Sequence, residues 1–186
     1  MKLTTHPLTP DRWMDFETLF GERGACGGCW CMVWRLKTSD WERRQGEANR
    51  KAMKALVDSG VVPGILGYVG GKPIAWCAVA LSESILRLER SRTLRRLDDL
   101  PTWSITCFFI HKDFRRQGIS SQLLEAAAKY VKSRSGRVVE GYPVVVRKGK
   151  LPDPFIWTGI VSMFEKAGFE VAAKPSATRR IVRRYV

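Results

Sequence analysis

A basic turn with a single glycine carries the residues of this chain with the most specific chemistry. It reads Arg115-Arg116-Gln117-Gly118-Ile119-Ser120, and it joins an apolar run at Ile105–Ile110 to a segment with apolar residues at helical spacing. The run has the β-branched and aromatic content of a buried strand. The first amides of a helix lack partners within it, and the helix dipole favours negative charge there. We therefore expect an anion site at this turn, with a phosphate or pyrophosphate as ligand.

The turn lacks the common nucleotide-binding patterns GxxxxGK(S/T) and GxGxxG. It resembles instead the Q/R-x-x-G-x-G/A signature of the GNAT acetyltransferase superfamily, with Ser120 in place of the usual Gly or Ala. The stretch Phe164–Phe169, which reads FEKAGF, is similar to that family's second marker, usually Y-E-K-x-G-F. The two markers come in the expected order, and the resemblance covers about residues 1–173.

The resemblance implies acetyl-CoA as co-substrate, in a cleft where the strand ending at Ile110 separates from the strand ending at Glu140. Backbone groups of Phe108–Ile110 would pair with the pantetheine arm. Backbone amides of the turn would bind the pyrophosphate, and its two guanidinium groups would add charge-assisted contacts. The predicted cofactor-binding residues are Phe108, Phe109, Ile110, Arg115, Arg116, Gln117, Gly118, Ile119, Ser120 and Phe164.

Acetyl transfer to an amine requires a deprotonated amine, a stabilised oxyanion and a protonated leaving thiolate. A backbone N–H near Phe109 or Ile110 could stabilise the oxyanion. The family commonly protonates the thiolate with the tyrosine of its second marker, but this chain has Phe164 there, which has no proton to donate. Glu140 is the candidate base, with a salt-bridged carboxylate as the alternative. Tyr142 is the candidate acid, with a packed aromatic ring as the alternative.

The stretch Cys26-Gly27-Gly28-Cys29-Trp30-Cys31 invites a metal or redox interpretation. A structural zinc site usually has four ligands, and the remaining cysteines, Cys77 and Cys107, lie in apolar strand patterns. We therefore expect no metal here. Instead we expect Trp30, Cys31 and Trp34 to line the acceptor pocket, with core packing of the aromatic rings as the alternative.

The elements that must position these residues follow the order β, α, α, β, β, β, α, β, α, β. Strand patterns lie at residues 2–8, 65–69, 73–80, 105–110 and 137–140, and a last strand or hairpin at Val171 and 178–185. Helical patterns lie at 10–20, 39–58, 119–135 and 157–167, and surface loops at 24–35 and 141–154. The second helix carries an S-x-x-E capping box at Ser39. This order predicts an α/β domain with a mixed, mostly antiparallel central sheet, flanked by helices and splayed between the fourth and fifth strands.

Composition sets the outer limits of the prediction. The 186 residues, 45% of them hydrophobic, suit one domain over residues 1–186. No apolar run is long enough for a membrane span and the N-terminus has no signal-peptide pattern, so we expect a cytoplasmic protein. The five cysteines do not suggest a secreted disulfide framework. The sequence is also compatible with a homodimer.

The net charge of +14 attracts polyanions, of which coenzyme A is one and nucleic acid another. The leading hypothesis is an acetyl-CoA-dependent N-acetyltransferase that transfers acetyl directly to a primary amine of a small molecule, or of a peptide. A non-catalytic acyl-CoA-binding or sensing protein is the second hypothesis, because Phe164 replaces the usual acid. A basic nucleic-acid-binding protein ranks last, since no recognition motif is present.

Overall fold

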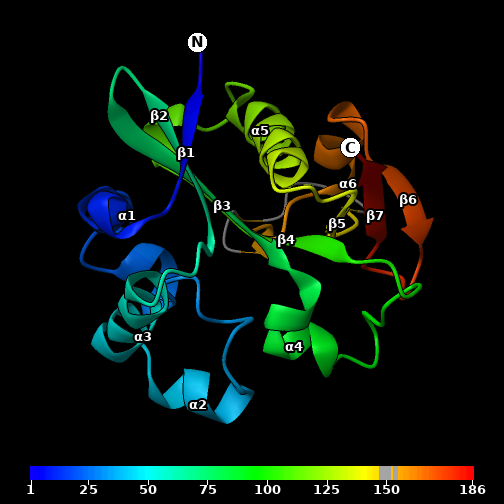
Figure 1. The fold of residues 1–186 in the computed structure, drawn as a ribbon, viewed down its shortest axis with the longest axis horizontal. Coiled ribbons are helices and arrows are strands. Elements are labelled where there is room, and N and C mark those ends of the chain that lie inside the picture. The colour runs from blue at the N-terminus through cyan, green and yellow to red at the C-terminus, as the bar shows by residue number, and fades with distance from the viewer. Residues whose placement is uncertain (147–151, 153–154) are drawn as a thin grey trace.

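The computed structural model describes residues 1–146, 152 and 155–186, and it contains a seven-stranded mixed sheet in the order β1-β2-β3-β4-β5-β7-β6 (Figure 1). All pairs are antiparallel except β4 with β5. The strands are β1 (Thr4–Pro7), β2 (Gly64–Val69), β3 (Lys72–Leu81), β4 (Thr102–Ile110), β5 (Val138–Gly141), β6 (Glu170–Ala173) and β7 (Ile181–Tyr185). The expected α/β class with a mostly antiparallel sheet is confirmed.

Helices cover both faces of the sheet, because alternate strand residues point to opposite sides. They are α1 (Trp13–Phe20), α2 (Thr38–Arg43), α3 (Glu47–Asp58), α4 (Leu86–Glu89), α5 (Ile119–Ser133) and α6 (Val161–Lys166). One core cluster joins the apolar faces of α5 and α6 to the sheet, and it includes Ile105, Leu123 and Phe164. A second cluster packs α1 and α3 on the opposite face, around Trp76.

The parallel pair β4–β5 is the feature that positions the site. It is registered only from Thr102 opposite Val138 to Ile105 opposite Gly141. Strand β4 then continues to Ile110, whereas β5 ends at Gly141. The predicted separation of the fourth and fifth strands is therefore confirmed.

Two predicted helices have different bounds in the structure. The helix predicted over residues 39–58 is divided into α2 and α3, because the chain turns at Gly46 with φ of 77°. Helix α2 begins before Ser39 and no side chain caps it, so the capping-box prediction is wrong. Helix α6 begins at Val161 rather than at Trp157. Of the loop predicted at 141–154, residues 147–151 and 153–154 lie outside the described part.

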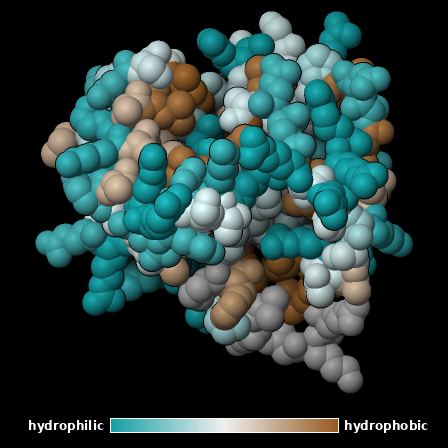
Figure 2. Space-filling view, turned by 90° about the horizontal axis from the view of Figure 1, so that it is seen from below, coloured by the Kyte–Doolittle hydropathy of each residue, from teal (hydrophilic) through white to brown (hydrophobic). Residues whose placement is uncertain are grey.

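The surface is largely hydrophilic on the face in Figure 2, as the charge of the chain requires, with hydrophobic side chains gathered beside the grey residues. None of the described helices is long and apolar enough to cross a membrane. Within the same residues, no group of three His, Cys, Asp or Glu side chains could hold a metal ion.

Candidate active site

The basic turn forms the N-terminus of α5. Gly118 is the N-cap with φ of 75°, and no side chain caps the helix. Arg116 also has a positive φ, 60°, so two residues of the turn adopt left-handed backbone angles. A Cβ atom on Gly118 would meet no protein atom within 4 Å, which leaves open space over the turn. Helix α5 thus begins without a side-chain cap, which keeps its first amides a candidate anion site.

The side chains of the turn are held by the backbone before it. Arg115 Nε donates to the carbonyl of Ile110 at 2.9 Å, and Gln117 Nε2 donates to the carbonyl of Asp113 at 2.8 Å. Arg116 is exposed and Ser120 is half-buried at the helix start. The end of β4 and the turn at Gly118 are thus connected as one unit.

The gap between β4 and the end of β5 is bordered by backbone groups. The amide of Phe108 faces the gap and donates to the carbonyl of Trp157 at 2.7 Å, whereas the amide of His111 donates to a β3 carbonyl at 2.8 Å. Because successive amides of a strand alternate in direction, that of Ile110 faces the gap and that of Phe109 faces β3. Of the two predicted oxyanion donors, only Ile110 therefore remains a candidate.

The segment Trp157–Ile160 occupies part of this gap. The amide of Val144 donates to the carbonyl of Gly159 at 2.9 Å, so the segment lies between the continuation of β5 and β4. Phe164 lies next to this segment, fully buried, and its ring is 5.8 Å from the ring of Phe108. The predicted pantetheine donor of Phe108 has a protein partner here, and Phe164 belongs to the core.

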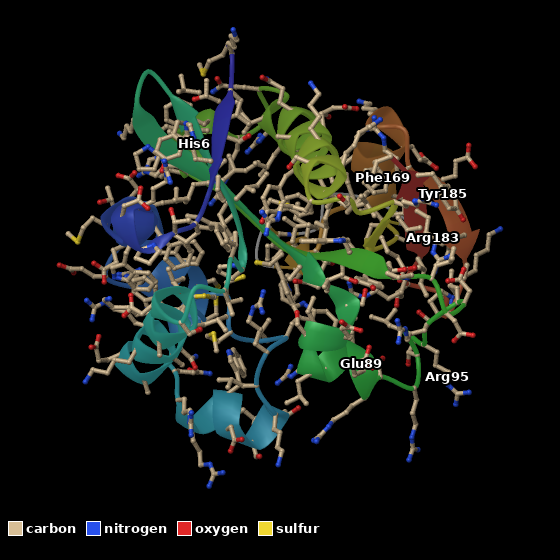
Figure 3. All side chains as sticks on the ribbon, viewed as in Figure 1. His6, Glu89, Arg95, Phe169, Arg183 and Tyr185 are labelled. Carbon is tan, nitrogen blue, oxygen red and sulfur yellow. The ribbon has the colours of Figure 1, made fainter. Side chains whose placement is uncertain are left out.

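Glu140 and Tyr142 form one buried network with Arg183. One carboxylate oxygen of Glu140 accepts a hydrogen bond from the Tyr142 hydroxyl at 2.8 Å, and the other accepts one from Arg183 Nε at 2.6 Å. Glu140 is 4% and Tyr142 2% exposed. Arg183, labelled on β7 in Figure 3, also pairs with Asp98. Glu140 therefore has the ion pair of the alternative interpretation, and it is also hydrogen-bonded to the candidate acid.

The sheet register explains this network. Glu140 lies opposite Arg183 on β7 and opposite Ser104 on β4. The Tyr142 hydroxyl is also 2.7 Å from the Ser104 hydroxyl, which is 2.6 Å from that of Ser82. The hydroxyl chain therefore lies at the last paired positions of β4 and β5, next to the point where the strands separate.

Burial and neighbouring charges set the protonation of this network. Burial raises the pKa of the Tyr142 hydroxyl well above its ordinary value, and the Glu140 charge raises it further. Burial acts to lower the pKa of Arg183, but hydrogen bonds to Asp98 and Glu140 outweigh it and raise that pKa. The hydrogen bond from Arg183 lowers the pKa of the Asp98 carboxyl. At neutral pH Tyr142 therefore keeps its proton and Arg183 its charge.

The predicted acceptor-pocket residues divide into two groups. Trp30 and Cys31 are 4% and 3% exposed and lie in the core cluster of α1, where the Trp30 ring stacks 5.7 Å from that of Phe20. Their positions match the packing alternative and correct the prediction that they line an open pocket. Trp34 is different, because its ring lies 6.4 Å from that of Tyr142 and 5.9 Å from that of Trp157.

Comparison with known proteins decides the family. The model of the acetyltransferase (GNAT) family matches residues 29–141, which is more than half of the chain. The chain belongs to the GNAT acetyltransferase family. That membership confirms the resemblance drawn from the two markers, and it fits acetyl-CoA as the co-substrate. A search of curated protein sequences finds no match.

Solved GNAT structures share the fold at low sequence identity. An acetyltransferase of the GNAT family from Listeria monocytogenes is 9% identical with a TM-score of 0.60, and the alignment covers 99% of this chain and 95% of that one. PaiA N-acetyltransferase from Thermoplasma acidophilum, in complex with coenzyme A, is 12% identical with a TM-score of 0.56 and full coverage of both chains. Aminoglycoside acetyltransferase AAC(6')-Ib, in complex with coenzyme A, is 14% identical with a TM-score of 0.55, covering 99% and 95%.

Several residues of this candidate site were not predicted from sequence. Arg183 had a usable signal, since it is a cation next to the apolar pair Ile181-Val182 in a predicted strand. Ser104 and Trp157 had none, because a serine at a strand end and a tryptophan carbonyl have no distinctive pattern. Their roles arise from the strand register and from the path of the segment before α6.

Proposed function

We propose that this protein is an acetyl-CoA-dependent N-acetyltransferase that transfers acetyl directly to the primary amine of a small molecule, or of a peptide. The observation that carries the proposal is the position of the buried Tyr142–Glu140 pair at the point where β4 and β5 separate. In the same unit, β4 leads directly to the open anion-binding turn at Gly118. The proposed acetyl-CoA site and the proposed catalytic pair thus both adjoin β4.

The donor would lie along β4. The amides at the start of α5 would bind its pyrophosphate, with Arg116 adding charge at the exposed side of the turn. The pantetheine arm would pair with the gap-facing groups of β4, which requires the Trp157 carbonyl to leave the Phe108 amide. The Ile110 amide would then stabilise the oxyanion.

Tyr142 would protonate the leaving thiolate, the role that Phe164 cannot fill. Its raised pKa keeps the hydroxyl protonated until the thiolate forms. The hydroxyl chain also supports the expected part of Glu140 as base. The chain runs from Glu140 through the hydroxyls of Tyr142, Ser104 and Ser82 to the Thr102 carbonyl. These four hydrogen bonds need four protons, but the three hydroxyls supply three. A fourth proton therefore fits on Glu140, between it and Tyr142.

That fourth proton would come from the acceptor amine, passed through Tyr142. Glu140 would hold this proton only until Tyr142 delivers one to the thiolate. Glu140 and Tyr142 would thus act together as base and acid at one position. Amine attack, collapse of the tetrahedral intermediate and thiolate protonation would follow without a covalent acyl-enzyme.

The decisive experiment measures thiol release from acetyl-CoA across a panel of primary amines, with the acetylated product identified by mass spectrometry. We expect release that depends on the amine, and a large loss for Glu140→Gln and for Tyr142→Phe. Full activity in Glu140→Gln would remove Glu140 from the chemistry. Thermal stabilisation by coenzyme A without thiol release for any amine would instead support the acyl-CoA sensor hypothesis, which Phe164 suggests because it replaces the usual acid.

A further inference from the structure

Among the described residues, three buried hydrogen-bond donors without acceptors belong to Arg87 on α4 and to two tryptophans that contact it. In the described part of the chain, Arg87 Nη2 and the indole Nε1 atoms of Trp34 and Trp41 are buried and have no hydrogen-bond partner. All three belong to one neighbourhood. The backbone amide of Arg87 donates to the carbonyl of Trp34 at 3.0 Å, and its guanidinium carbon lies 5.8 Å from the centre of the Trp41 ring.

The Arg87 side chain is held in place by other contacts. Its Nε donates to the carbonyl of Leu36 at 3.1 Å, which fixes the guanidinium plane against the segment between the two tryptophans. Within the residues that the structure describes, its charge has no counterion at close range. Glu42 is the acidic residue that influences it, but that side chain is exposed and no ion pair within 4.0 Å joins them in the described part. Burial lowers the pKa of the guanidinium.

Such an arrangement is costly without a ligand. A buried polar group without a partner destabilises the fold, and native proteins satisfy the large majority of such groups. The three atoms are all donors, and one of them carries a positive charge. The group that satisfies them best has acceptors only and a negative charge, which describes a carboxylate.

The donors also lie next to the proposed chemistry. The Trp34 ring is 6.4 Å from the ring of Tyr142, the proposed acid. Leu88, the residue after Arg87, packs in one cluster with Tyr142. A small molecule held by Arg87 would therefore lie between α4 and the end of β5, with its amine close to the hydroxyl chain.

We propose that the acceptor amine carries a carboxylate, as amino acids do, and that Arg87 binds this group together with the indole N–H groups of Trp34 and Trp41. The proposal rests on the N-acetyltransferase function and specifies its substrate class. Arg87 is the specificity-determining residue, because its positive charge pairs with a carboxylate and gains nothing from an amine that has none. The two indoles add donors and an apolar wall.

The test compares matched acceptors that differ in the carboxylate alone. For a panel of amino acids, kcat/KM is measured for each acid, for its neutral amide and for its decarboxylated amine. We expect wild-type protein to prefer the carboxylate by about 10–100-fold, the value of one hydrogen bond to a charged group. In Arg87→Met the ratio of acid to amide should fall to about one, and Arg87→Lys should restore part of it. Trp41→Phe should lower the ratio less.

Arg90→Met is the matched control, because Arg90 is exposed at the end of the same helix and the change removes the same charge. It should leave the ratio and the KM for acetyl-CoA unchanged. Equal use of acid and amide by wild-type protein, or a preference that survives Arg87→Met, would overturn the proposal. An equal loss for acid and amide in Arg87→Met, together with a lower melting temperature, would make Arg87 merely structural and would also overturn it.

Failure of the proposed function gives a different result. In that case no amine consumes acetyl-CoA, although coenzyme A still stabilises the protein. The carboxylate site at Arg87 is then tested by binding alone. Tryptophan fluorescence is measured in titrations with N-acetyl amino acids and with their amides. Saturable binding of the acids that Arg87→Met abolishes would support the site, and equal or absent binding of both would refute it.

Discussion

The Tyr142 hydroxyl donates a 2.8 Å hydrogen bond to one carboxylate oxygen of Glu140, while Arg183 holds the other oxygen at 2.6 Å. Both ends of the carboxylate are thus occupied, and its orientation is fixed by a residue from the last strand. A carboxylate held in this way cannot turn towards a substrate. In the proposed mechanism it would act through Tyr142, whose hydroxyl carries the proton of this hydrogen bond.

Removal of the Tyr142 hydroxyl should reduce kcat far more than it affects folding. For Tyr142→Phe we expect a loss of about 10²–10⁴-fold in kcat, the usual contribution of a general acid or base. The KM for acetyl-CoA should stay close to the wild-type value. The free energy of unfolding, measured with urea, should fall by about 1–3 kcal/mol because Glu140 and Ser104 lose a buried partner.

The control for this variant is Tyr185→Phe, since that tyrosine is 68% exposed on β7 (Figure 3). It should change neither kcat nor stability. A Tyr142→Phe protein with wild-type kcat would show that water or another group protonates the thiolate.

Stability should decline in alkaline solution because of the buried tyrosine. The pKa of Tyr142 is raised in the folded state by burial and by Glu140, so the unfolded chain releases its proton first as pH rises. Its contribution is complete below about pH 10, the ordinary tyrosine value, and is lost above it at up to about 1.4 kcal/mol per pH unit. Urea unfolding between pH 8 and about 11 should show this decline, and it should be less steep in Tyr142→Phe. Equal slopes in both proteins would contradict the assigned direction of the pKa.

The anion-binding turn can be tested with two glycines of nearly equal geometry. Gly118 in the turn has φ of 75° and Gly71 in the β2–β3 hairpin has φ of 76°, and at either position an added Cβ atom would have no protein atom within 4 Å. Alanine at either position should therefore cost a similar backbone strain, about 1–2 kcal/mol. Gly118→Ala alone should weaken coenzyme A binding, by about tenfold or more, as calorimetry would measure. Equal affinity for coenzyme A in Gly118→Ala and Gly71→Ala would show that the pyrophosphate does not bind at this turn.

The segment before α6 should compete with the donor for β4. Thr158 is fully buried, and its hydroxyl accepts a 2.7 Å hydrogen bond from Arg179 Nη1, which helps to hold the Trp157 carbonyl on the Phe108 amide. Thr158→Val removes that bond and should favour the open arrangement. The apparent Kd for coenzyme A should then fall by up to about fivefold, the equivalent of a bond worth ~1 kcal/mol.

Thr18→Val, at an exposed position of α1, is the control, since the Thr18 hydroxyl donates to the Met14 carbonyl of the same helix. It should leave the Kd unchanged. An unchanged or higher Kd in Thr158→Val would show that the donor binds without displacing Trp157.

The sequence by itself determined the parts of this protein that depend on neighbouring residues. The strand, the turn at Gly118 and helix α5 are contiguous, so residue pattern and local backbone geometry were enough to predict an anion site there. The element order and the second marker then indicated the fold and the family. Local pattern failed at Gly46, where one positive φ divides a helix that the periodicity predicted as continuous.

Only the tertiary structure decided how the chemistry is arranged. Glu140 and Arg183 are 43 residues apart in the chain, and they meet because β5 and β7 are neighbours in one register. The Trp157 carbonyl reaches Phe108, and Arg87 reaches Trp34, through folding of separate segments. Hydrogen bonds and charges act over a few ångströms in space, whatever the separation in sequence. A linear pattern can therefore single out the turn at Gly118, but which carboxylate is paired and which buried donors have partners depend on packing.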